Sequence, residues 1–494
     1  MSKQLRKSLT EELGKRHGYK VMETKIKPVH LANALMRTEH QSVGRMSVLQ
    51  QLFEGTLARN SLDQRVAAVR SMVDSQRDRW GALGQASDLK GSALMTKVLP
   101  LIRTLLGADG AAYGTSPDMS SFSSPTALTV TGDPSDDGAG AFVHELWGGH
   151  DERYRLPILT LLAELTSPTK DAAQMDDLSA LLAPLVDKTR PRVSAKPDRP
   201  DEIVYSPLEQ RLRAAANCLC AYERKLQPNP ISSLQRVVLL AALSLFTHAA
   251  TRAQEDGVAP ERILLLDSTG DRYSPIAKGS TRCVGQLLSD AGDYMASVLN
   301  DLLSKQFPDW PSAPLSAVNS LLEHSGLAPL DSTSQLARRI DDITRDSGDL
   351  EEVRREVADE LVRQAEGSSR RGLDGYLRML GIRAGYLYPI QKNPQKRLNP
   401  SDRTLEVLVA STIDVSVPPV EYRDFLEQFR QRWGIVVGGR PEDAALLARL
   451  GIPVSARLLS ENSDRFLTRL ESLGVARRLA DSVAVVGLLE ANHE

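Results

Sequence analysis

The chain has few cysteines, few aromatic residues and almost no net charge. Only three of its 494 residues are cysteines, Cys218, Cys220 and Cys283, and their uneven spacing excludes a disulfide framework and favours a reducing, cytoplasmic compartment. Aromatic residues make up 5% of the chain, which favours helices packed through Leu, Ala and Val. The net charge of −2 excludes a global field that would draw the protein to nucleic acid or a membrane. Any such binding must therefore come from a local patch.

Long hydrophobic runs are also absent. The most apolar run, 237–246, is much shorter than the roughly 20 residues that a membrane-spanning helix needs. We therefore expect a buried core helix at this position and no membrane partner.

Common catalytic and nucleotide-binding motifs are missing from the sequence. There is no P-loop, no Gly-x-Gly-x-x-Gly after a strand and no Gly-x-Ser-x-Gly elbow. Cys218 and Cys220 are two apart on a predicted helix, so their side chains diverge and do not chelate one metal. The sequence predicts no catalytic residue, no metal and no cofactor.

The chain is too long for one ordinary core, so several domains are expected. The pattern predicts a mainly α protein with minor β structure, a multidomain helical scaffold. We divide it into an N-terminal helical region (1–106), a Gly/Ser/Pro-rich loop or insertion (107–140), a helical segment (141–187), a linker (188–204), a central helical domain (205–368), a basic connecting segment (369–403) and a C-terminal module (404–494).

The central domain contains the clearest secondary-structure signals. Ser206, Pro207 and Glu209 form a capping-box pattern, and an apolar stripe follows as far as Leu226. The residues 262–267 form an apolar run typical of a buried strand. Later in the domain a narrow apolar stripe predicts a helix through Leu350, Val353, Val357 and Leu361.

Three polar features have both a functional and a structural interpretation. The basic residues of 1–27 suit a nucleic-acid arm or, as we favour, a solvated helix. His144, Glu145 and His150 suit a metal site only if a bent loop brings the histidines together, because they are six apart, and a polar surface turn is the simpler interpretation. Asp267, after the predicted strand, could bind a metal or phosphate, or could cap its own backbone in a turn.

The C-terminal segment carries the pattern most specific to a class of partner. A β-like run at 404–412 precedes a succession of elements in the order of a winged helix-turn-helix. These are a helix at 419–433, a short helix at 441–450, a second helix at 463–473, a basic turn at 475–478 and a strand at 482–487.

The second of these helices is the predicted recognition helix. Its apolar residues are expected to face inward, which leaves Arg465 and Arg469 on the opposite face, with Arg477 and Arg478 in the turn beyond. Guanidinium groups bind phosphates and fork onto guanine edges. A basic, proline-rich stretch could add contacts to the nucleic-acid backbone through Lys392, Lys396 and Arg397.

These patterns favour a non-catalytic, cytoplasmic subunit of a larger bacterial assembly, with DNA processing or phage defence as the expected setting. The winged-helix-like module would contact DNA or a partner subunit. Two alternatives stay open: an enzyme with an unrecognised phosphate- or metal-dependent site near Asp267, and a purely structural protein–protein adaptor.

Overall fold

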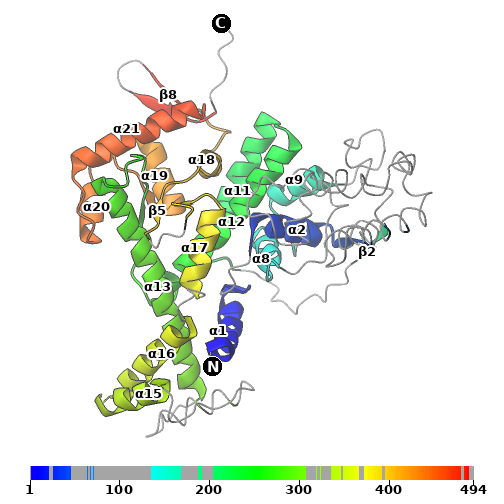
Figure 1. Ribbon diagram of the computed structural model, residues 1–494. Coiled ribbons are helices and arrows are strands. Elements are labelled where there is room, and N and C mark those ends of the chain that lie inside the picture. Colours follow the sequence, from blue (N-terminus) through cyan, green and yellow to red (C-terminus); the bar gives the residue numbers. More distant parts are fainter. Residues whose placement is uncertain are drawn as a thin grey trace. The chain divides into compact units, whose positions relative to one another are not determined.

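The computed structural model is mostly helical, with 65% helix and 6% strand, which confirms the predicted class. Contacts divide the chain into two units. Figure 1 labels their helices and strands. Unit 1 comprises Met1–Thr24, Leu243–Ile413 and Val417–Glu494, and unit 2 comprises Lys25–Ala242 and Asp414–Ser416. The structure describes residues 2–21, 26–45, 135–167, 187–191, 204–306, 335–346, 349–366, 372–391, 395–479 and 483–488, with the isolated positions 64, 67, 71, 319 and 323.

Unit 2 is built from helices packed through small and aliphatic residues. Helix α2 (Pro28–Glu39) packs against α8 (Ala139–Leu146) and α9 (Pro157–Thr166), and α9 packs against α11 (Pro207–Leu226). A Cβ atom on Gly140 would come within 2.4 Å of the Ala34 Cβ atom, so glycine permits the close approach of α8 to α2. A two-stranded antiparallel sheet, β1 (Ser42–Arg45) with β2 (Asp187–Pro191), completes the described part of this unit.

Helix α11 begins with the predicted capping box. The Ser206 hydroxyl accepts a hydrogen bond from the Glu209 amide, and the Glu209 carboxylate accepts one from the Ser206 amide. The next helix, α12 (Pro230–Glu255), contains the boundary between the two units. Among the described helices it alone is long and apolar enough to cross a membrane, and 72% of its apolar window is buried inside the protein. That burial is typical of a core helix and confirms the prediction for 237–246.

In unit 1 the long helix α13 (Pro275–Gln306) contacts α1 (Ser2–His17), α16 (Leu350–Glu366) and α17 (Leu373–Arg383). Helix α15 (Gln335–Asp346) packs against α16. The predicted stripe on α16 is confirmed at Val353, Val357 and Leu361, which are all buried.

Short strands meet at the N-terminal part of α13. Strand β3 (Leu264–Leu265) pairs in parallel with β7 (Ile435–Val436), and β4 (Leu387–Tyr388) pairs antiparallel with β5 (Arg397–Leu398). A parallel bridge between Leu266 and Leu398 joins the two pairs. The buried strand predicted at 262–267 is thus confirmed over a shorter span.

The C-terminal segment begins with α18 (Asp402–Ala410). The elements that follow are β6 (Val420–Glu421), α19 (Tyr422–Trp433), β7, α20 (Asp443–Arg449), α21 (Ala456–Ser472), β8 (Ala476–Arg478) and β9 (Ala484–Val486). Three of these strands form an antiparallel sheet in the order β6-β9-β8.

Three expectations for this segment were wrong in detail. The run 404–412 is mostly helical, because Ser401 caps α18 through the Thr404 amide and the helix buries most of its valines and leucines. Helix α21 begins at Ala456 rather than at 463, since Ser455 caps it through the Leu458 amide. The basic turn at 475–478 is strand β8.

A cluster of buried rings lies in the core of unit 1. The His17 ring lies 5.9 Å from that of His248 and 5.8 Å from that of Tyr294, between centroids. Burial lowers the pKa of His17 to about 4 and that of His248 to about 3, with the nearby Arg252 acting in the same direction. Both histidines are therefore neutral at physiological pH.

Candidate functional site

The candidate site begins at the loop between β3 and α13. The Asp267 carboxylate caps this loop, since its Oδ1 accepts hydrogen bonds from the Thr269 amide (2.9 Å) and hydroxyl (2.6 Å). The Thr269 hydroxyl lies 3.0 Å from that of Ser274, which caps α13 by accepting a bond from the Ala277 amide. The self-capping turn considered for Asp267 is confirmed.

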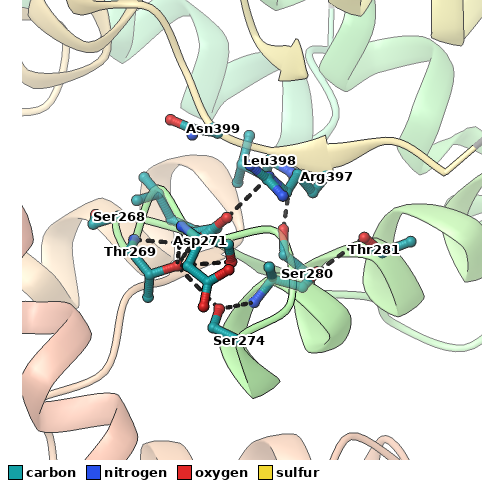
Figure 2. A network of polar contacts seen from close by, with 12 residues as sticks. Ser268, Thr269, Asp271, Ser274, Ser280, Thr281, Arg397, Leu398 and Asn399 are labelled. Atoms are coloured by element: carbon teal, nitrogen blue, oxygen red, sulfur yellow. Dashed lines mark hydrogen bonds and ion pairs between the residues drawn. The ribbon is translucent and has the colours of Figure 1, made fainter. Parts of the chain in front are cut away.

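Strand β5 holds the loop from its other side. The Asp267 amide donates to the Leu398 carbonyl at 2.9 Å. The Leu398 amide donates to the Ser280 hydroxyl, also at 2.9 Å (Figure 2). The Arg397 Nε atom lies 3.0 Å from Asp267 Oδ2 in an ion pair that is almost fully buried. Asp267 is thus neutralised by a cation from β5.

Helix α21 locks the same loop through one buried side chain. Asn462, which has no exposed surface, donates from Nδ2 to the carbonyls of Leu266 and Val437 and accepts the Ser268 amide at Oδ1, all at 2.8 Å. These backbone groups follow β3 and β7 directly. Asn462 therefore fixes the carboxyl ends of both parallel strands.

A cleft of about 1030 Å³ opens beside this loop, between α13 and the β4–β5 hairpin. Its volume lies at the upper end of the range of roughly 300–1,000 Å³ that is usual for small-molecule sites. The lining residues are mostly cationic, aromatic or amide-bearing: Gly270, Arg272, Tyr273, Lys278, Thr281, Arg282, Tyr388, Pro389, Gln391, Gln395 and Arg397.

The cleft wall is basic. Four cations line it, and no acidic residue of the described chain does. Lys278 and Arg282 are one helical turn apart on α13 and exposed, and among the described residues no carboxylate pairs with either of them. Arg397 is balanced by Asp267, so the exposed Lys278 and Arg282 are the cations of this concave site that attract an anionic ligand.

Two tyrosines add aromatic surface to the same wall. Tyr273 of the loop is 65% exposed and Tyr388 of β4 is 43% exposed. The Arg272 guanidinium lies 4.5 Å from the Tyr273 ring centroid, and that of Arg397 lies 5.2 Å from the Tyr388 centroid. Each ring is thus covered on one face by an arginine of the cleft.

Two of the predicted nucleic-acid contacts on α21 bind the protein itself. Arg465 is exposed, and its Nη1 atom donates to the Thr269 carbonyl at 2.8 Å. Arg469 donates to the Asp402 carboxylate at 2.8 Å and also to the Pro400 carbonyl. Both side chains therefore tie α21 to neighbouring loops.

The other predicted contacts occupy different environments. Arg477 and Arg478 are exposed on β8, and Arg478 pairs with Glu471 at 3.0 Å. Lys396 is 3% exposed, donates to the carbonyls of Pro389 and Gln391, and has its pKa lowered by burial. Lys392 lies outside the described residues, so of the basic stretch only Arg397 is seen to line the cleft.

The histidines of 144–150 do not form a metal centre. The His144 Nε2 atom lies 3.0 Å from the Glu39 carboxylate, which also accepts a hydrogen bond from Arg155. These bonds lower the pKa of Glu39 although burial opposes the shift. In the described part of the chain, no three His, Cys, Asp or Glu side chains gather closely enough to hold a metal ion.

The sequence contains a signal for the cleft that the predicted site residues did not include. Lys278 and Arg282 are spaced i, i+4 on a helix that directly follows the Asp267 loop. The aromatic Tyr273 lies between Asp267 and the start of this helix.

Comparisons with protein-family models, with curated proteins and with solved structures found no match to this chain.

Proposed function

We propose that this protein binds nucleic acid without catalysing a reaction on it, and that the basic cleft holds the phosphate backbone. The observation that carries the proposal is the wall with Arg272, Lys278 and Arg282, which no described acid lines, beside Arg397, whose charge Asp267 balances. Most polar contacts of nucleic-acid-binding proteins go to phosphate and sugar, and such cations gain affinity by releasing counterions.

The proposal assigns no catalytic role to Asp267. Its Oδ1 atom accepts two hydrogen bonds from Thr269 and its Oδ2 atom faces Arg397. A carboxylate engaged in this way has a structural use, which favours a binding protein over an enzyme with a metal at this position.

In this proposal the segment 404–494 is a winged-helix-like module, supported by the order α19, α20, α21 and the β8–β9 hairpin. Strand β7 differs from that pattern, because it pairs with β3 rather than with the hairpin. The role of α21 is to brace the cleft loop through Arg465 and Asn462. The exposed Arg477 and Arg478 supply a second basic surface for DNA.

The proposed setting is a cytoplasmic bacterial assembly in DNA processing or defence. All of the described residues that line the cleft belong to unit 1. Unit 2 is therefore available for another purpose, and docking of partner subunits is the one we favour.

The test is a binding titration of labelled single-stranded and double-stranded DNA from about 50 to 200 mM salt. The cleft variant carries Lys278→Glu and Arg282→Glu. The matched control carries Arg338→Glu and Arg339→Glu, because these two arginines are also exposed on a helix of unit 1 but lie outside the cleft lining.

Binding that falls steeply with salt, and is weakened about tenfold or more by the cleft variant alone, supports the proposal. Equal binding by all three proteins, or none at the lowest salt, overturns it. A thermal melt of each variant shows that the fold is retained.

A further inference from the structure

We propose, building on the function proposed above, that the cleft takes a single strand of nucleic acid whose bases stack on Tyr273 and Tyr388. Among the described residues the exposed large hydrophobic side chains include only two aromatic rings, and both line this cleft. The exposed aromatic rings of the described residues thus lie where the cations are. That combination of a phosphate-binding groove with aromatic platforms is how proteins bind single strands without reading sequence.

The stacked arginines make the two rings suitable platforms. The guanidinium of Arg272 covers one face of Tyr273, and its Nη2 atom donates to the Tyr273 hydroxyl. Arg397, held by Asp267, covers one face of Tyr388. In this proposal a base stacks on the other face of each ring, and the exposed Arg272 reaches the adjoining phosphate.

The concave shape selects against a duplex. Proteins read double-stranded DNA with a helix or ribbon that projects into a groove, where base edges are accessible. Here the aromatic rings lie in the wall of a cleft, and the bases of a duplex are stacked on one another and unavailable to them. Only unpaired bases can be splayed onto side chains in this way.

The two platforms come from different parts of the chain that the fold brings to one cleft. Tyr273 follows β3, whereas Tyr388 ends β4, and β5 with Arg397 connects them through the Asp267 ion pair. A nucleic-acid strand that contacts both tyrosine rings therefore crosses the cleft rather than lying along α13 alone.

The experiment compares labelled oligothymidylate, oligouridylate and a DNA hairpin duplex, with inorganic polyphosphate as competitor. The proteins are the wild type, the variant with Tyr273→Ala and Tyr388→Ala, and a control with Tyr273→Phe and Tyr388→Phe. The control keeps both rings and removes only the hydroxyl groups. The variant with Lys278→Glu and Arg282→Glu is titrated beside them.

We expect the affinity for the single strands to exceed the affinity for the duplex about tenfold or more. The double alanine variant is expected to lose about tenfold or more in single-strand affinity, whereas the phenylalanine control retains it. The salt slope is expected to stay the same in the alanine variant, because its phosphate contacts are intact.

Two results would count against the inference in distinguishable ways. Equal affinity for duplex and single strands, unaffected by loss of the tyrosine rings but abolished by the charge reversal, refutes base stacking and leaves nucleic-acid binding standing. If the Lys278→Glu and Arg282→Glu variant binds nucleic acid as tightly as the wild type, both proposals are refuted. Binding of polyphosphate without any binding of nucleic acid also refutes both.

Discussion

The carboxylate of Asp267 and the guanidinium of Arg397 form an ion pair, with 3.0 Å between Oδ2 and Nε, and both side chains are almost fully buried. Arg397 at the same time lines the cleft and covers the Tyr388 ring. The pair therefore links the turn after β3 to the opposite wall of the cleft. The ion pair fixes the Arg397 guanidinium at one position in the cleft wall, where an unpaired, flexible arginine would lie only part of the time.

Replacing Asp267 by asparagine tests this pair. Asn keeps an oxygen for Thr269 but leaves the Arg397 charge buried and uncompensated, so we expect a loss of about 3 kcal/mol in the free energy of unfolding. Urea denaturation measures the loss. Adding Arg397→Met to the same chain is expected to restore part of it, because the unpaired charge is then removed. If the Asp267→Asn variant alone were as stable as the wild type, this account would be contradicted.

Asn462→Leu is expected to be among the more destabilising substitutions in the C-terminal segment. Leucine is similar in size, but it leaves the Ser268 amide and the carbonyls of Leu266 and Val437 without partners in a buried place. Each buried group left unsatisfied costs about 1–3 kcal/mol, so a total of roughly 3 kcal/mol or more is expected in urea unfolding. Ser460→Ala, an exposed position on the same helix, is the control and should change little.

The buried histidines predict that stability falls in acid. His17 and His248 have pKa values of about 4 and about 3 in the folded protein, below the ordinary histidine value of 6.5. Below pH 6.5 the unfolded chain therefore binds more protons than the folded protein does. The stability that these two neutral histidines contribute above pH 6.5 is lost as the pH falls toward about 4 and below. At about 1.4 kcal/mol per pH unit for each histidine, roughly 2 kcal/mol per histidine is lost by pH 5.

Urea unfolding at pH 7 and at pH 5 measures this loss. The variant with His17→Gln and His248→Gln should show a smaller difference between the two pH values, even where its stability at pH 7 is reduced. An undiminished difference in the variant would assign the acid sensitivity to other groups.

Local patterns predicted much of the helical framework. The capping box at Ser206 and the stripe through Val353 to Leu361 each depend on neighbours in sequence, and both were confirmed. The run at 404–412 was mistaken for a strand because its β-branched residues favour strands when considered alone. The Ser401 cap and burial of one helical face decided the outcome instead.

The site itself could be predicted only in part. The turn at Asp267 was recognised, but its ion pair with Arg397 joins residues far apart in sequence, and periodicity carries no information about such contacts. The same reason explains why the contacts of Arg465 and Arg469 within the protein were not predicted. Their partners, Thr269 and the loop at 399–402, lie on segments that only the folded chain brings to α21.

The contact between Asn462 and Leu266 joins positions that are 196 residues apart. At about 5–20 residues per second, a ribosome takes roughly 10 to 40 s to pass from the first of these residues to the second. Helix α13 and its cations are synthesised early in that interval, whereas the side chain that locks the neighbouring loop is added last. A nascent chain must therefore wait for α21 before the walls of the cleft acquire their final arrangement.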